Sequence, residues 1–350
     1  MEKILYLAHT QPDGTLPKIA FEVLSAALEL TQKLSGATLS AGLIGGDVQT
    51  AANAIAGAGA AKILGVAGPD FASSRYASDA EALQVLIRQS GATLVIAPAT
   101  SRFSRAMPGA AYRLNGRTDT HVSGFETDGG KLSIQRWYYR QRMMATMTRT
   151  TRPWILLMDS GVFQPWQGKT GTASVELVPV ALTEKAKRTQ VLGFQAPAVS
   201  QQTIRPDAEL LFVAGAGWTK KQSDGQTHVK EAEQLILDFL AKTQASLGSS
   251  KSLVDQSTEG AAVLSCLSHL NQVGQTGSTP RHPKGLATCC HGEEPHVVGW
   301  RFINERRAVN LDPNCGWAQG KADVLYVADA FQVMKKVNEL AGKECVVQAK

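Results

Sequence analysis

The chain is poor in cysteine, in aromatic residues and in long hydrophobic runs. Its five cysteines, in 350 residues, are an odd number and all lie in the last 85 residues, so no disulfide framework follows from them, which indicates a reducing compartment. No run approaches the roughly 18 apolar residues that a membrane-spanning helix needs, and the first residues do not resemble a secretory signal peptide. These absences predict a cytoplasmic protein that does not insert into a membrane.

Charged residues are also few, at 19% of the sequence, and their signs are unevenly distributed. Residues 1–200 contain 20 basic and 14 acidic side chains, whereas residues 201–350 contain 16 of each, so the first part carries the whole net charge of +6. No basic stretch is interleaved with stacking aromatics, which argues against nucleic-acid binding. We interpret the positive part as a face for a protein partner.

Apolar strand-like runs alternate with helix-like segments along most of the chain. Four such runs begin at residues 3, 38, 61 and 93, and a second series begins at residue 209, includes a helical stretch at 260–270 and ends in a helix over 330–342. This alternation predicts βαβ units and parallel sheets. We therefore expect two α/β domains, 1–164 and 206–350, joined by a polar linker arm over 165–205.

Residues 132–158 depart from this alternation, because they have β-rich runs with alternating polar positions and no helical period. We predict antiparallel strands added to the edge of the first sheet. Four arginines in this stretch are interpreted as solvated, outward-facing positions: Arg136, Arg140, Arg142 and Arg149.

Several short motifs carry little information by themselves. Gly215-Ala216-Gly217 follows a predicted strand but lacks the last glycine of the dinucleotide-binding fingerprint. Cysteines and histidines gather near the end of the chain: Cys289, Cys290, His291, His296 and Cys315. Adjacent cysteines seldom bind one tetrahedral zinc ion, and the sequence has no C-x-x-C. We therefore predict no metal site, and no histidine spacing indicates a Ser-His-Asp triad.

The most distinctive motif is the loop Gln272-Val273-Gly274-Gln275-Thr276-Gly277. Its amides and hydroxyl, held between glycines, are suited to the polar edge of a heteroaromatic ring. Three further pieces follow it at regular spacing: Cys289-Cys290-His291-Gly292-Glu293-Glu294-Pro295-His296, Ala308-Val309-Asn310-Leu311-Asp312-Pro313 and Val327-Ala328-Asp329.

In this order and spacing, the motifs make residues 272–329 resemble the α subunit of electron-transfer flavoproteins. That family has a Q-V-G-Q-T-G loop, then a G-I-S-G-A-I-Q-H loop, an A-I-N-x-D-P strand end and a V-x-D before the last helix. The first domain also matches, through Ala97-Pro98-Ala99-Thr100 and the stretch 136–163. The likeness spans almost the whole chain.

The resemblance implies a redox carrier rather than an enzyme with its own substrate. It implies a Rossmann-like first domain and a flavodoxin-like or DHS-like second domain that binds FAD. It also implies a heterodimer with an electron-transfer flavoprotein β subunit, electrons arriving from flavin dehydrogenases of the acyl-CoA or N-methyl-amine type, and a quinone reductase as acceptor.

Residue by residue, the resemblance places Gln275 and Thr276 at the isoalloxazine ring, His296 at its pyrimidine edge, and Asn310 and Asp329 at the AMP half. The cofactor-binding residues carried over are Lys251, Gln272, Gly274, Gln275, Thr276, Gly277, His291, Gly292, His296, Asn310, Asp312 and Asp329.

Some positions depart from the family pattern. Gly217 stands where the family has an arginine, and Lys251 replaces the arginine of its G-A-S-R motif. Glu293 and Glu294 place two acids where the family has small apolar residues. These changes keep two alternatives open: a flavin-free scaffold subunit of a dehydrogenase complex, and an AMP-binding regulator.

Overall fold

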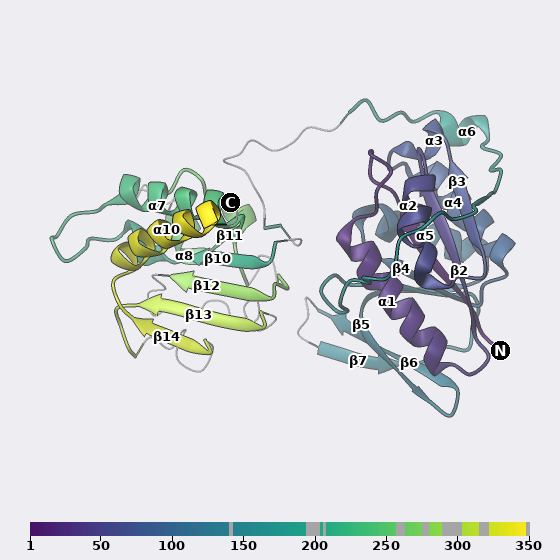
Figure 1. The fold of residues 1–350 in the computed structure, drawn as a ribbon, viewed down its shortest axis with the longest axis horizontal. Helices are drawn as coiled ribbons and strands as arrows, with labels where there is room; N and C mark the ends of the chain where they lie inside the picture. The colour runs from purple at the N-terminus through teal and green to yellow at the C-terminus, as the bar shows by residue number, and fades with distance from the viewer. Residues whose placement is uncertain are drawn as a thin grey trace. The chain divides into compact units, whose positions relative to one another are not determined.

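The computed structural model describes residues 1–139, 143–193, 204–205, 208–256, 263–274, 280–288, 303–314 and 322–347. The chain divides into two compact units, Met1–Phe194 and Gln195–Lys350 (Figure 1). Each unit contains a sheet of mostly or entirely parallel strands with helices packed against it, which confirms the predicted pair of α/β folds.

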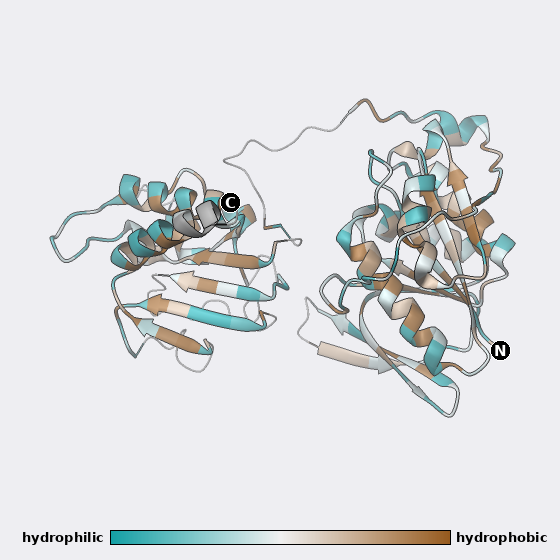
Figure 2. Cartoon of the chain, viewed as in Figure 1, coloured by the Kyte–Doolittle hydropathy of each residue, from teal (hydrophilic) through white to brown (hydrophobic). Residues whose placement is uncertain are grey.

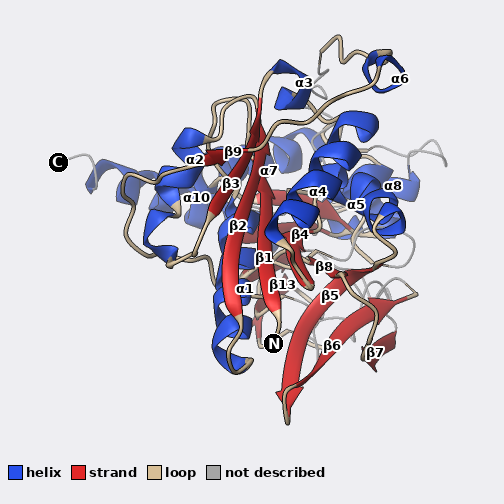
Figure 3. Ribbon diagram, turned by 90° about the vertical axis from the view of Figure 1, so that its right-hand side faces the viewer, coloured by secondary structure: helices blue, strands red, loops and turns tan. Residues whose placement is uncertain are grey.

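The first unit is built on a nine-stranded sheet in the order β7-β6-β5-β8-β4-β1-β2-β3-β9. Its strands are β1 (Lys3–His9), β2 (Thr38–Gly45), β3 (Ile63–Ala67), β4 (Leu94–Pro98), β5 (Arg117–Asp128), β6 (Lys131–Tyr138), β7 (Met143–Met147), β8 (Trp154–Met158) and β9 (Glu176–Leu177). Pairing is parallel from β5 through β8 to β9, and β6 pairs antiparallel with both β5 and β7. Figure 3 shows β5, β6 and β7 at one end of this sheet.

Helices cover both faces of the first sheet because its central strands are apolar on both sides. The helices of this unit are α1 (Lys18–Lys33), α2 (Gln49–Ala54), α3 (Pro69–Ala72), α4 (Tyr76–Ser90), α5 (Ser101–Arg113) and α6 (Glu184–Lys187). Along β1, Ile4 and Tyr6 belong to the core under α1, whereas Leu5 and Leu7 belong to the core under α4 and α5. No helix in the described ranges has the length and apolar character to cross a membrane.

The prediction for residues 132–158 is correct in part. β6 and β7 are antiparallel, but Trp154–Met158 is an interior strand that pairs parallel with β4 and β5. All five residues of β8 are buried, so a continuous apolar strand at the sheet centre, and not an edge strand, explains this part of the sequence.

The interpretation of the arginines as solvated positions is wrong for Arg136 and Arg149. Both donate to the carboxylate of Asp119, which is completely buried on β5. Arg136 Nη1 lies 2.7 Å and Arg149 Nη2 lies 2.9 Å from Asp119 Oδ1, and Trp154 Nε1 lies 2.8 Å from Oδ2. A buried acid on the neighbouring strand therefore turns these arginines inward. Arg140 and Arg142 lie outside the described residues.

The segment that we expected to be a connecting arm, 165–205, contacts the first unit along its described beginning. Within it, β9 pairs with β3, and Val175 packs against the core under α1. Val178 and Val180 pack against the core on the opposite face.

The second unit contains a five-stranded, all-parallel sheet in the order β11-β10-β12-β13-β14. The strands are β10 (Leu210–Ala214), β11 (Ser246–Ser249), β12 (Lys284–Thr288), β13 (Glu305–Asn310) and β14 (Val324–Val327). In chain order this is 2-1-3-4-5, the flavodoxin-like order. Figure 2 shows the start of β13 as hydrophilic and β10 as apolar.

The long helices of the second unit pack side by side on one face of its sheet (Figure 1). The helices here are α7 (Val229–Thr243), α8 (Lys251–Asp255) and α10 (Ala330–Val347). Phe239 of α7 and Met334 of α10 share a core with Phe212 of β10. The predicted helix at 260–270 is wrong for its described part, 263–270, where the only helical turn is a short 3-10 turn beginning at His269.

We expect the Asp119 carboxylate to be essential for the antiparallel end of the first sheet. Replacing Asp119 with alanine leaves Arg136 and Arg149 without their buried counter-charge, and we expect a loss of about 3–5 kcal/mol in local stability. Hydrogen–deuterium exchange of peptides from β5 and β8 measures this loss. The control is Glu29→Ala, which removes an exposed ion pair with Lys33 and should cost less than about 1 kcal/mol.

This stabilisation should also depend on pH. Burial raises the pKa of Asp119, but hydrogen bonds from Arg149 and Trp154 and the charges of Arg149 and Arg136 outweigh it, so the pKa lies below its usual value. The stabilisation is therefore complete above the usual aspartate pKa of about 4. It declines as the pH falls through the lowered pKa of Asp119 in the folded protein. Equal exchange rates in D119A and E29A would contradict this role.

Candidate functional site

The carboxyl ends of the parallel strands in the second unit bring together the described candidate residues. Lys251 follows the end of β11, Asn310 ends β13 and Asp329 follows the end of β14. Ligands of open parallel sheets bind at this end, because the loops that leave the strands converge there. The fold therefore places these residues where a ligand site is expected.

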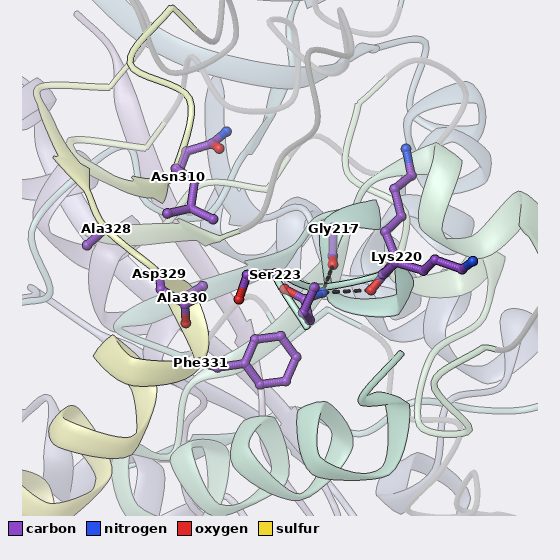
Figure 4. A pocket seen from close by; sticks show the side chains of 11 residues that line it. Gly217, Lys220, Ser223, Asn310, Ala328, Asp329, Ala330 and Phe331 are labelled. Atoms are coloured by element: carbon purple, nitrogen blue, oxygen red, sulfur yellow. Dashed lines mark hydrogen bonds between the residues drawn. The ribbon is translucent and has the colours of Figure 1, made fainter. Parts of the chain in front are cut away.

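A pocket of about 360 Å³ lies at this end of the sheet (Figure 4). One side is formed by Asn310 and Leu311 after β13 and by Ala328, Asp329, Ala330 and Phe331 around the start of α10. The other side is formed by Gly217 and by Lys220, Lys221, Gln222 and Ser223, which follow β10. This volume falls within the range of small-molecule sites.

Hydrogen bonds to its own loop fix the position of Asn310. Its Oδ1 accepts from the backbone N–H of Asp312 at 3.1 Å, and Asp312 Oδ1 in turn accepts from Asn314 N at 2.8 Å. The Asn310 carbonyl accepts from Ala328 N at 3.2 Å, which joins the ends of β13 and β14. Asn310 is 8% exposed, so its side chain is held at the rim of the pocket.

Asp329 marks the start of the 18-residue helix α10. Its Oδ1 accepts from Gln332 N at 2.9 Å, and its carbonyl accepts from Val333 N at 3.0 Å. An acidic residue here satisfies an amide at the helix start and lies at the positive end of the helix dipole. Figure 4 shows Asp329 on the same side of the pocket as Asn310.

Lys251, Gln272 and Gly274 come together at the same carboxyl end of the strands, but beside β11, at the other edge of the sheet. Gln272 pairs with Ser249 in a parallel bridge, and Val273 N donates to Ser249 O at 3.0 Å. Gln272 and Val273 therefore lie beside Ser249, and the next residue, Ser250, caps the start of α8. Gly274 has a φ of +81°, which glycine adopts readily.

The charge of Lys251 is already paired. Its Nζ lies 2.7 Å from Asp255 Oδ2, and this carboxylate raises the pKa of Lys251 through a hydrogen bond and its charge. Asp255 was not among the predicted binding residues, although a carboxylate four residues after a lysine on a helix is a recognisable pairing pattern.

Other candidate residues lie outside the described part of the chain. They are Gln275, Thr276, Gly277, His291, Gly292 and His296, together with the possible zinc ligands Cys289, Cys290 and Cys315. The described ranges contain no group of three histidine, cysteine or carboxylate side chains that could hold a metal ion.

The pocket also contains residues that are not among the predicted binding residues: Lys220, Lys221, Gln222, Ser223 and Phe331. The loop bearing the first four follows Gly215-Ala216-Gly217, which we considered an incomplete glycine motif. The sequence could have pointed to these residues through the glycine-rich turn after the first strand of a parallel sheet. Ligands bind at such turns even without the full dinucleotide-binding fingerprint.

Comparison with known proteins gives matches along the whole chain. The family model described as "Electron transfer flavoprotein domain" matches residues 4–185, just over half of the chain. The protein named "Electron transfer flavoprotein subunit alpha" from Thermoanaerobacterium thermosaccharolyticum is 24% identical over 335 residues, which cover 95% of this chain and 96% of that protein.

Two clostridial proteins are similar to the same extent. "Protein FixB" from Clostridium saccharobutylicum is 26% identical over 345 residues, covering 97% of this chain and 94% of that protein. "Electron transfer flavoprotein subunit alpha" from Clostridium acetobutylicum is 24% identical over 346 residues, covering 97% and 95%. With the family model matching most of the first unit and these relatives spanning both units, the chain belongs to the electron transfer flavoprotein family.

Proposed function

We propose that the chain is an α-type electron-transfer flavoprotein subunit that binds FAD in its second unit. In this proposal it pairs with a β subunit and carries electrons from a flavin dehydrogenase, of the acyl-CoA or N-methyl-amine type, to a quinone reductase. The observation that carries the proposal is the pocket between Asn310, Asp329 and the Lys220–Ser223 loop, at the carboxyl end of a flavodoxin-order sheet.

The chemistry of this pocket suits the adenosine part of FAD. Leu311 and Phe331 offer apolar surface for a purine base, and the Asp329 carboxylate is an acceptor for ribose hydroxyls. Lys220 and Lys221 offer positive charge for phosphate groups, and Ala330 and Phe331 at the start of α10 line the same pocket.

The neighbourhood of β11 suits the other half of FAD. Ser249 is completely buried, and its Oγ has no hydrogen-bond partner within the described ranges. A buried hydroxyl without a partner is costly, so a polar group from the Gln272–Gly277 loop or from a ligand there would stabilise the site. Lys251 and Gln272 flank Ser249, which supports placing the flavin ring on this side.

In this proposal the chain binds FAD and tunes its reduction potential, and the cofactor supplies the redox chemistry. When bound, FAD accepts and releases electrons. Asn310 and Asp329 would hold the nucleotide end, and Lys251 would set the electrostatic potential near the ring. The excess positive charge in residues 1–200 supports a protein partner on the first unit.

Purification together with the β subunit tests the cofactor directly. We expect a yellow 1:1 complex with absorption bands near 370 and 450 nm, and FAD released on denaturation. A colourless protein that still binds AMP would favour the regulator instead, and one that binds neither would favour the scaffold subunit.

Substitutions at Asn310 and Asp329 test the location of the nucleotide end. Asp329→Asn keeps a cap for α10 but removes the charge and one ribose acceptor, and Asn310→Ala removes the loop amide. We expect each to raise the FAD dissociation constant about tenfold in equilibrium dialysis. Glu339→Gln, farther along α10, is the control, and variants that bind FAD as tightly as this control would refute the location.

The Lys251–Asp255 ion pair provides a test of whether Lys251 tunes the flavin reduction potential. Asp255→Asn removes a negative charge and frees Lys251, so we expect the flavin reduction potential to rise by roughly tens of millivolts. The matched control is Asp238→Asn, which breaks the equivalent i,i+4 pair with Lys242 on α7. If both variants leave the potential unchanged in a redox titration, Lys251 does not act on the flavin.

A further inference from the structure

The helices on the two faces of the first sheet differ in charge. α1 and α2, on one face, contain two basic and two acidic side chains, so their charges cancel. α4, α5 and α6, on the opposite face, contain six basic and three acidic side chains, a net charge of +3. Figure 3 shows α1 and α4 on opposite sides of β1. The positive charge of these helices is therefore concentrated on one face, which we call the α4–α6 face.

Ion pairs join α4 to α5 and use up the carboxylates of both helices. Arg102 Nη2 lies 2.6 Å from Asp79 Oδ1, and both side chains are buried. Arg113 Nη1 lies 3.1 Å from Glu81 Oε1. Because two ion pairs cross between the helices, the surface that they form is fixed before a partner arrives, which lowers the entropic cost of binding.

α6 is held against the same surface. Leu182, just before this helix, packs on the core under α4 and α5. Just after the helix, the carbonyl of Thr189 accepts from Arg75 Nη1 at 2.9 Å. The chain on both sides of α6 is thus attached to the first unit, and α6 contacts α4.

This pairing leaves exposed cations on the α4–α6 face without counter-charges. Glu184 is the one carboxylate of the three helices that does not pair with an arginine of α5. Four exposed basic side chains form no ion pair with any side chain in the described ranges: Arg88, Arg105, Lys185 and Lys187. An acidic surface would therefore gain charge complementarity here without first breaking an ion pair.

Two exposed tyrosines lie among these cations. Tyr112 is 84% exposed and Tyr76 is 44% exposed. Arg105, Pro108 and Tyr112 are three and four residues apart on α5, so they form one exposed stripe. Tyrosine and arginine are enriched in protein interfaces and supply many of the side chains on which affinity depends.

The composition of this face favours a protein that associates transiently. Permanent interfaces are mostly apolar, whereas the exposed positions of α5 include two arginines. Helices that lie on membranes present a row of large apolar side chains. The exposed positions of α5 contain no leucine, isoleucine, valine, methionine or phenylalanine.

We propose that the α4–α6 face is the docking surface for a transient protein partner with an acidic face. In this arrangement Tyr112 is the central aromatic contact, and Arg105 binds carboxylates beside it. Opposite charges speed the encounter and make it depend on salt. This inference goes beyond the proposed function and does not depend on flavin binding.

A defined acidic probe tests the charge of this face. The probe is a fluorescein-labelled, helical, glutamate-rich peptide that carries one tyrosine, and its binding to the full chain is measured by fluorescence anisotropy. We expect Arg105→Glu to raise the dissociation constant about tenfold and added salt to weaken binding. Lys18→Glu, at an exposed position on α1, is the matched control with the same change of charge, and should raise it less than about twofold.

Variants of Tyr112 test the aromatic contact separately from charge. Tyr112→Ala leaves the net charge unchanged but removes the exposed ring, so we expect about a threefold to tenfold weaker binding of the same peptide. Tyr112→Phe keeps the ring and should bind as the parent does. Binding to the alanine variant that equals binding to the parent would contradict the central role of Tyr112.

Hydrogen–deuterium exchange locates the contact and separates the alternatives. The peptide should protect residues 76–90, 101–113 and 184–187 and leave α1 unchanged. Equal weakening by R105E and K18E would show an effect of net charge alone and overturn the inference. So would tighter binding of phosphatidylserine vesicles or a single-stranded DNA oligonucleotide than of the peptide, or protection of this face by the β subunit alone. None of these assays involves flavin, so such failures would leave the proposed FAD site standing.

Discussion

Parallel pairing of five strands in the order β11-β10-β12-β13-β14 is the constraint on which the site depends. It brings the ends of β13 and β14 together, through the hydrogen bond from Ala328 N to Asn310 O. It also places the Gly217–Ser223 segment across the pocket from them. Residues about 90 positions apart in the chain line one pocket because all the strands run in the same direction.

The two units use charge in different ways. In the first, the buried Asp119 carboxylate accepts hydrogen bonds from two arginines and an indole, at the junction of the parallel and antiparallel strands. In the second, Lys220 and Lys221 line an open pocket and have no ion pair with described side chains. The first arrangement supports folding, whereas the second leaves two exposed, positively charged side chains beside the pocket.

Hydrophobic periodicity was sufficient to predict most of the fold. It located β1 to β4 and their helices, because buried parallel strands and amphipathic helices have distinct repeats. It failed at β8, since a continuous apolar run does not say whether its neighbours are parallel. It also missed β11, whose sequence Ser246-Leu247-Gly248-Ser249 has little β propensity and is buried by its position beside β10.

Whether a charged side chain is buried or exposed can depend on a partner far away in the sequence, which the local pattern does not reveal. Arg136 and Arg149 had the spacing of outward-facing positions, but Asp119, 17 and 30 residues away, draws them inward. The candidate site was predicted from motif resemblance at Asn310 and Asp329, which the fold brings to one pocket. Lys220 and Lys221 belong to no such motif, and only the structure shows that they line the same pocket.

The central claim is that FAD binds at the carboxyl end of the second sheet. Hydrogen–deuterium exchange of the complex with the β subunit, with and without FAD, tests it most directly. We expect FAD to slow exchange in peptides covering 216–223, 310–314 and 328–333, with little change in the peptides of β1 to β4. Protection confined to the first unit, or none in these three segments, would contradict it.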